Sequence, residues 1–185
     1  IYVIDHEDSF TYNLVHLLDN FGTTYVSNYF NIDKKKLDTC KIIVFSPGPG
    51  DPSHYPETQK IYYQYKGLKK IIGICLGFQQ ILYAEKGQII AQKKIFHGYQ
   101  SRIRVLNGSS LFKPNKILLG GRYHSLKLKE PFYNKNLKIT MRCAETNVAM
   151  AIEDTINNVY GFQFHPDSFL TVDGKFLIQK ILQAK

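Results

Sequence analysis

The sequence has no tryptophan and only three cysteines (Cys40, Cys75 and Cys143), which are widely spaced and form no CxxC pair. This argues against a disulfide-stapled secreted protein and against a thiolate zinc site, and it favours a reducing compartment. No apolar run approaches the roughly 20 residues needed to span a bilayer. The first residues are typical of a strand and an acidic loop rather than of a signal peptide. We therefore expect a cytoplasmic protein with no membrane partner.

Phosphate-binding and metal-binding patterns are also missing. The chain contains no GxxxxGK[ST] loop and no spacing of histidine, cysteine and carboxylate residues typical of a metal site. We expect neither a metal nor another cofactor in this chain.

Positive charge is in excess, since 24 lysines and arginines face 15 aspartates and glutamates, for a net charge of +9. A basic nucleic-acid-binding module is one interpretation, and salt-sensitive binding of DNA or RNA would favour it. However, there is no arginine-rich stripe and no aromatic RNA-binding signature. The basic residues fall in short groups that we interpret as solvated surface, so we expect no nucleic-acid partner; these groups are 34–36, 69–70 and 93–94.

The 185 residues, 44% hydrophobic and 21% charged, suit one domain spanning 1–185 with a core of its own. The first half alternates apolar strands with amphipathic helices, which predicts an open, mostly parallel α/β sheet with helices on both faces. The second half predicts a small antiparallel or mixed region of short strands. We expect strands at 1–4, 25–29, 41–45, 70–74, 103–105, 117–119, 138–142, 148–152 and 159–164, and helices at 10–21 (capped by Asp8 or Ser9), 57–65, 78–86 and 174–183.

Two unusual loops follow predicted parallel strands, where ligands bind on such sheets. The first is 46–52, with the sequence Ser-Pro-Gly-Pro-Gly-Asp-Pro. It is compatible with a plain rigid turn. Glycines held between prolines also leave backbone N–H groups rigidly aimed, which is what an oxyanion or a carboxylate needs.

The second loop, 73–79 (Gly-Ile-Cys-Leu-Gly-Phe-Gln), has the pattern of a nucleophile elbow with cysteine in the place of serine. The glycines permit a tight turn from strand to helix, and the helix N-terminus stabilises a thiolate at Cys75. The N–H of Leu76 would then point at a developing oxyanion. A buried, inert cysteine is the alternative, and it is our interpretation of Cys40 and Cys143.

A nucleophilic cysteine needs a base, and that base needs an orienting acceptor. We expect His16 and His54 at the surface. His165 ends an apolar strand and is followed by Pro166 and Asp167, an extended segment that would keep the imidazole and the carboxylate on the same side. We therefore predict a triad of Cys75, His165 and Asp167, assembled from distant segments.

These motifs together name a family. The segments at 46–50, 73–79 and 163–168 (Gln-Phe-His-Pro-Asp-Ser) resemble the triad, or class I, glutamine amidotransferases. The segments 5–13 (DHEDSFTYN) and 122–126 (RYHSL) look like the branch that serves chorismate-using synthases. That branch comprises component II of anthranilate synthase and the amidotransferase of aminodeoxychorismate synthase.

The resemblance implies roles for particular residues. Cys75 would attack the side-chain amide of L-glutamine, His165 would transfer the proton, and Asp167 would orient the imidazole. Water would then hydrolyse the thioester, and ammonia would pass to a chorismate-using synthase subunit, on which any magnesium is expected. The oxyanion hole would comprise the N–H groups of Gly48 and Leu76, and glutamine would be held by Gly48, Pro49, Gly50, Gln79, Ser125 and Leu126.

Two positions depart from the family pattern. Asp167 stands where glutamate is usual, and its side chain is one methylene shorter, so it must move closer or reach His165 less well. His97-Gly98-Tyr99 replaces the usual His-Gly-Lys and loses a charge where the partner is expected.

Several functional alternatives stay open at this point. Anthranilate synthase is slightly favoured over aminodeoxychorismate synthase because Phe162 precedes Gln163. A stand-alone gamma-glutamyl hydrolase and a catalytically silent interaction domain are weaker alternatives. The sequence begins at Ile1 rather than at methionine, so membership of a larger fusion is also open.

Overall fold

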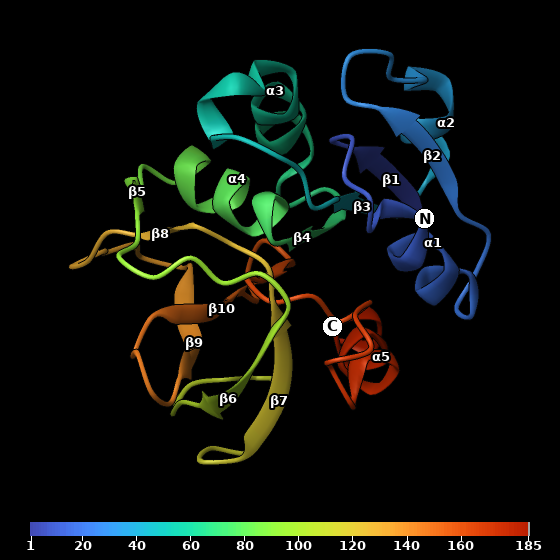
Figure 1. Cartoon of the computed structure of the whole chain (residues 1–185). Helices are drawn as coiled ribbons and strands as arrows, with labels where there is room; N and C mark the ends of the chain where they lie inside the picture. Colours follow the sequence, from blue (N-terminus) through green and yellow to red (C-terminus); the bar gives the residue numbers. More distant parts are fainter. Residues whose placement is uncertain (185) are drawn as a thin grey trace.

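The computed structural model describes residues 1–184 and is built around one nine-stranded sheet, ordered β2-β1-β3-β4-β11-β10-β9-β6-β7 (Figure 1). Its first five strands are parallel: β1 (Tyr2–Asp5), β2 (Tyr25–Asn28), β3 (Ile42–Phe45), β4 (Lys70–Ile74) and β11 (Val159–Phe162). The remaining pairings are antiparallel and involve β6 (Tyr99–Val105), β7 (Ile117–Arg122), β9 (Lys138–Cys143) and β10 (Ala149–Asp154). A separate two-stranded sheet pairs β5 (Ile89–Ala91) with β8 (Leu126–Leu128).

Helices cover both faces of the parallel half. On one face, α1 (Thr11–Asp19) and α5 (Gly174–Gln183) pack against Val3 and its neighbours. On the other, α2 (Lys34–Thr39), α3 (Pro56–Tyr65) and α4 (Leu76–Ala84) pack against the alternate side chains, such as Ile4. Strands buried on both faces need continuous apolar runs, which is why this half is so apolar in sequence. The predicted fold class is confirmed.

Several predicted boundaries were wrong. Helix α1 begins at Thr11, without a side-chain cap, because the Asp8 carboxylate accepts instead from the N–H of Phe10 (2.8 Å). Helix α4 begins at Leu76, since the chain turns directly from β4 into the helix. The short helix α2 was not predicted; its N-cap is Asp33, which accepts from the N–H of Lys36 (3.1 Å).

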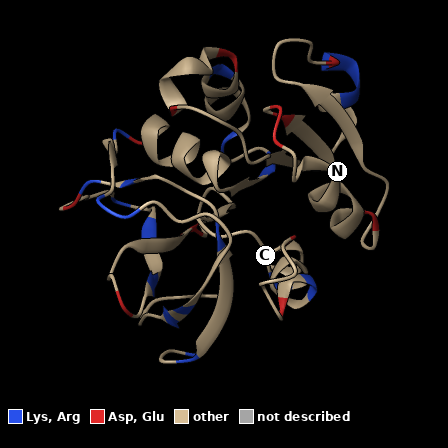
Figure 2. Ribbon diagram, viewed as in Figure 1, with Lys and Arg blue, Asp and Glu red and all other residues tan. Residues whose placement is uncertain are grey.

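Most lysines and arginines are spread over several helices, strands and loops (Figure 2). Lys70 is a correction to the expectation of solvated basic groups. It is buried, and its ammonium donates to the carbonyls of Ile181 (2.6 Å), Leu182 (3.1 Å) and Ala184 (2.8 Å). Its positive charge therefore caps the negative C-terminal end of α5 and ties it to β4.

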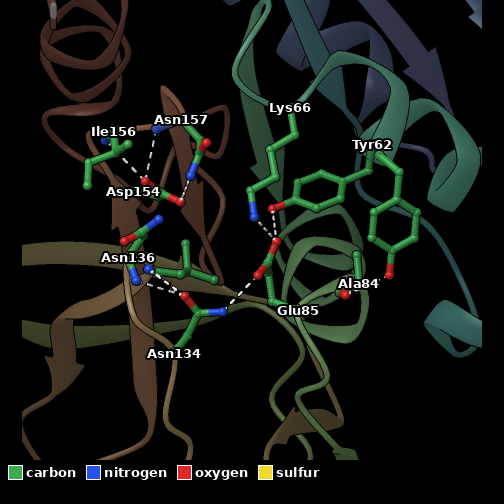
Figure 3. A network of polar contacts seen from close by, with 11 residues as sticks. Tyr62, Lys66, Ala84, Glu85, Asn134, Asn136, Asp154, Ile156 and Asn157 are labelled. Atoms are coloured by element: carbon green, nitrogen blue, oxygen red, sulfur yellow. Dashed lines mark hydrogen bonds and ion pairs between the residues drawn. The ribbon is translucent and has the colours of Figure 1, made fainter.

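The C-terminal end of α4 is held by a polar network around Glu85 (Figure 3). The Glu85 carboxylate accepts from the Tyr62 hydroxyl (2.6 Å), the Lys66 ammonium and the Asn134 amide (2.7 Å). This network connects α3, α4 and the loop before β9. In residues 1–184, no helix has the length and apolar character needed to cross a membrane.

Candidate active site

Three adjacent parallel strands, β3, β4 and β11, end at the same edge of the sheet. Phe45 pairs with Gly73, and Ile74 pairs with Phe162, so the segments that follow these strands emerge side by side. These segments carry Gly48, Cys75 and His165. The sheet therefore brings together the three loops that the sequence singled out, at the edge where ligands bind on such sheets.

Cys75 occupies the turn between β4 and α4 in a strained conformation. Its backbone has φ 53° and ψ −101°, a region that non-glycine residues rarely adopt. A Cβ atom on Gly73 would lie 2.4 Å from the Gly77 carbonyl oxygen, so the tight turn requires glycine there. The geometry is that of a nucleophile elbow. Cys75 lies at the helix N-terminus and is largely buried, with 7% of the residue exposed.

His165 is fixed close to Cys75. Its N–H donates to the Gly121 carbonyl (2.9 Å), and its ring packs against those of Phe10 (5.1 Å) and Tyr123 (5.0 Å), which also contact each other (4.7 Å). Burial lowers the pKa of the imidazole, but the negative charges of Cys75 and Asp167 outweigh this effect and raise that pKa to about 10. A protonated imidazole is therefore favoured, which places a positive charge beside the Cys75 sulfur, the environment of an activated cysteine.

Asp167 lies beside His165 but does not hydrogen-bond to it. The distance from His165 Nδ1 to Asp167 Oδ1 is 3.6 Å, which exceeds an ordinary N–H···O bond. Both carboxylate oxygens of Asp167 and both ring nitrogens of His165 are buried without a hydrogen-bond partner among the described residues. The carboxylate is thus placed to act on the imidazole mainly through its charge.

The oxyanion positions, Gly48 and Leu76, lie against each other. A Cβ atom on Gly48 would lie 2.6 Å from Leu76 Cδ2 and 2.5 Å from the Cβ of His6, so only glycine fits. The buried His6 supports this loop, because its N–H donates to Ser46 Oγ (2.9 Å) and its Nε2 lies 2.9 Å from Thr58 Oγ1. His6 therefore fixes this loop, and Gly48 lies against the side chain of Leu76, the first residue of α4.

The residues expected to hold glutamine divide into two groups. Gln79 and Leu126 are in contact, because Gln79 Nε2 donates to the Leu126 carbonyl (3.4 Å). Ser125 is exposed next to Leu126. Pro49 and Gly50 are also exposed, on the opposite loop, where the Pro49 carbonyl accepts from the Tyr55 hydroxyl (2.8 Å).

Gln163 is part of this site, although sequence reasoning assigned it no role. It is fully buried; its Oε1 accepts from Gln79 Nε2 (3.1 Å), and its Nε2 lies 3.5 Å from the Cys75 carbonyl oxygen and 3.9 Å from Cys75 Sγ. Gln163 therefore connects the nucleophile to the residue expected to hold the substrate. Its place in the motif next to His165 was the available signal.

The other candidate residues lie elsewhere. His16 and His54 are exposed, whereas the thiols of Cys40 and Cys143 are buried. No group of three or more histidine, cysteine or carboxylate side chains within the described part of the chain is arranged to hold a metal ion.

Solved structures share this fold. A protein described as belonging to a GMP synthase from Thermoplasma acidophilum has a TM-score of 0.83 at 20% identity, covering 98% of this chain and 90% of that one. A glutamine amidotransferase from Thermotoga maritima has a TM-score of 0.76 at 13% identity, covering 98% and 95%. At these identities the likeness concerns the fold, an α/β protein with a mostly parallel sheet and helices on both faces.

The family follows from the sequence comparison. The family model Glutamine amidotransferase class-I matches residues 2–184. This chain belongs to the class I glutamine amidotransferase family, and it is an enzyme of that class.

Relatives are similar over nearly the whole chain. Anthranilate synthase component 2 of Lactococcus lactis is 35% identical, with 98% of this chain and 93% of the relative covered. The protein of the same name from Methanocaldococcus jannaschii is 38% identical over 92% of this chain and 86% of its own length. A bifunctional protein TrpGD from Thermotoga maritima matches all of this chain at 35% identity, but only 32% of its own length is covered.

Proposed function

We propose that this chain is the glutaminase subunit of an anthranilate synthase and supplies ammonia to a chorismate-using partner subunit. The observation that carries the proposal is the Cys75 elbow beside His165, with Gly48 and Leu76 at the adjacent helix N-terminus. The relatives named anthranilate synthase component 2 support the choice of pathway. The family match over residues 2–184 supports one amidotransferase domain.

In the first half of the reaction, side chains and backbone groups of this chain act on glutamine. Cys75 Sγ attacks the amide carbon of glutamine, and its proton resides on His165. The N–H groups of Gly48 and Leu76 stabilise the oxyanion of the tetrahedral intermediate. His165 then donates the proton to the departing nitrogen, the C–N bond breaks, ammonia leaves, and the acyl group remains on Cys75 as a thioester.

Water completes the cycle. His165 accepts a proton from the attacking water, the thioester breaks, and glutamate and the free thiol are released. Asp167 favours the charged imidazole during both steps. This chemistry needs no metal, and we propose that any magnesium belongs to the partner, where chorismate reacts.

The partner also completes the arrangement of the catalytic loops. An amidotransferase that hydrolysed glutamine freely would release ammonia where no acceptor waits. Contact with the synthase would favour the arrangement in which Gly48 and Leu76 both face the oxyanion. Because one oxyanion donor is worth about 100-fold or more in rate, a small loop displacement suffices for control.

The test measures glutamate release with and without the synthase subunit, with chorismate present. We expect a low rate alone and a large increase with the anthranilate-forming subunit. The Cys75→Ser variant should lose at least about 10⁴-fold of glutamine-dependent activity, while the complex still uses free ammonia.

Three results would contradict the proposal. Glutamate release by Cys75→Ser at the parent rate would exclude Cys75 as the nucleophile. Equal rates of glutamate release with and without the partner would show that the partner does not control the catalytic loops, and would favour a stand-alone hydrolase. Stimulation only by the aminodeoxychorismate-forming subunit would move the chain to that pathway.

A further inference from the structure

A second cavity lies away from Cys75 and His165, on the antiparallel half of the molecule. It has a volume of about 350 Å³ and opens beside β6, β7 and the turn after β9. This volume suits a small organic ligand. Its lining includes Lys94, Phe96, Tyr99, Arg102, Arg122 and Glu145.

The cavity is positively charged. Lys94, Arg102 and Arg122 line it, and Glu145 is the single carboxylate among the lining residues. That carboxylate already accepts from the Cys143 thiol (3.2 Å). Three cations thus share one carboxylate, whose charge also acts on Arg122, so the cavity keeps an excess of positive charge.

Arg122 is the most unusual of these cations, because its side chain is fully buried. Its Nε donates to His124 Nε2 (3.0 Å), and its Nη1 donates to Ser101 Oγ and Cys143 Sγ (both 3.4 Å). Its Nη2 has no partner in residues 1–184, and no carboxylate there forms an ion pair with it. A buried guanidinium is costly without an anionic partner, so this site is incomplete as it stands.

Two cations share one aromatic ring at this cavity. The Arg122 guanidinium lies 3.4 Å from the centre of the Phe96 ring, and the Lys94 ammonium lies 5.1 Å from it. Lys94 also lies 4.4 Å from the ring of Tyr99. A positive charge thus lies beside Tyr99, and aromatic surface stands next to both cations.

We propose that this cavity binds a carboxylate attached to an apolar body, with Arg122 and Lys94 as its charged partners and Phe96 and Tyr99 against its apolar part. The unpartnered Nη2 of Arg122 can donate to a carboxylate oxygen, in a charge-assisted hydrogen bond. The ligand is either a free small carboxylate or an acidic side chain of the partner subunit, since both present the same group.

The cavity is coupled to the glutamine site through His124. Burial and the nearby Arg122 charge lower the pKa of His124 to about 3, so its ring is neutral. Because Arg122 Nε donates to Nε2, the ring proton lies on Nδ1, which donates to the Leu126 carbonyl (2.8 Å). Leu126 also accepts from Gln79 (3.4 Å), so a carboxylate on Arg122 acts on the backbone expected to hold glutamine.

The binding test uses sodium benzoate and sodium acetate on the whole chain, with sodium chloride at matched ionic strength as the control, followed by NMR chemical shifts. We expect saturable binding, tighter for benzoate because of the aromatic lining. Lys94→Gln should weaken benzoate binding about fivefold, the upper range for a partly exposed ion pair. Lys93→Gln is the matched control, because Lys93 is exposed but does not line the cavity.

A second arm identifies the source of the carboxylate. The association constant with the synthase subunit is measured for the parent chain, Lys94→Gln and Lys93→Gln. Weaker association of Lys94→Gln alone, about fivefold, assigns the site to an acidic side chain of the partner. Benzoate binding that Lys94→Gln weakens, without any effect on association, assigns it to a free carboxylate.

Either positive arm supports the proposal. The proposal is overturned if neither carboxylate binds saturably and the association constant with the synthase subunit is unchanged in the variants. It is also overturned if Lys94→Gln and Lys93→Gln lose equal affinity, because a loss at both positions would reflect the net positive charge rather than a specific site. Its effect on catalysis rests on the proposed function: benzoate should change the KM for glutamine more than kcat. A chain that binds benzoate but releases no glutamate even with the synthase subunit and chorismate present would refute the proposed function and leave this site standing.

Discussion

The buried polar groups at the two ends of α4 differ in whether they have hydrogen-bond partners. At the C-terminal end, burial would raise the pKa of Glu85, but hydrogen bonds from Lys66, Tyr62 and Asn134 lower it, so the carboxylate is fully partnered (Figure 3). At the N-terminal end, Cys75 is strained, and the buried polar atoms of His165 and Asp167 lack hydrogen-bond partners among the described residues.

This difference indicates that the C-terminal end of α4 contributes to stability, whereas the N-terminal end contributes to reactivity. A saturated network resists opening and fixes α4 against α3 and the neighbouring loop. Unpartnered groups cost stability, but they are free to bind a substrate and to exchange its protons. We therefore expect changes at one end to alter rates and changes at the other to alter the free energy of unfolding.

The largest effect is expected at the catalytic pair. His165→Ala should reduce glutamine-dependent activity by about 10³-fold or more, because it removes proton transfer. Asp167→Asn should cost only about tenfold, because its carboxylate is 3.6 Å from the imidazole and acts through charge. Steady-state glutaminase kinetics measure both.

Asp167→Glu sharpens this prediction. The longer side chain can reach hydrogen-bond distance from His165 Nδ1, so activity should rise. A loss for Asp167→Asn as large as that for His165→Ala would instead show that the aspartate is fully integrated into the triad.

The opposite end should show a stability effect. Glu85→Ala removes the shared acceptor of three donors and should lower the free energy of unfolding by about 2–3 kcal/mol. The activity of the folded enzyme should be retained. Glu57→Ala is the control: its ion pair with Lys60 is exposed, and its loss should cost under about 0.5 kcal/mol.

Urea unfolding of both variants provides the measurement. If Glu85→Ala were as stable as Glu57→Ala, the network would contribute nothing. If it lost activity without losing stability, the two ends of α4 would not be separable.

The smallest expected effect concerns pH. Burial lowers the pKa of His6 to about 3, against 6.5 for an ordinary histidine. Below pH 6.5 the unfolded chain binds a proton that folded His6 does not, so stability should fall as pH drops from about 6.5 towards 3. His6→Asn should reduce this slope in thermal unfolding, whereas His16→Asn, at an exposed position, should leave it unchanged.

The parallel half of the fold could be predicted because its signals are local. Apolar runs such as 41–45 and 70–74 mark doubly covered strands, and the glycines at 73 and 77 mark the turn. Helix α2 escaped prediction because six residues with three lysines show no apolar periodicity. Lys70 was misjudged because its partners, the last carbonyls of α5, are distant in sequence.

The site was predictable to a similar extent. Cys75 and His165 were predicted from motifs to lie together, and the structure brings them together through β4 and β11. The environments of Gln163 and Arg122 could not be found this way, because each depends on segments that meet only in the folded sheet. Position in a motif does not reveal which buried group lacks a partner.

The place of β11 in the sheet has a consequence for the order of folding. Along the chain β11 is separated from β4 by α4 and by β5 to β10, yet it is the strand that covers the open edge of β4. During synthesis one edge of β4 stays unpaired until those segments have emerged, and an unpaired strand edge can pair with other chains. Cys75 directly follows β4, and His165 follows β11, which is synthesised much later. Cys75 and His165 therefore come together late in folding, only when β11 has paired with β4.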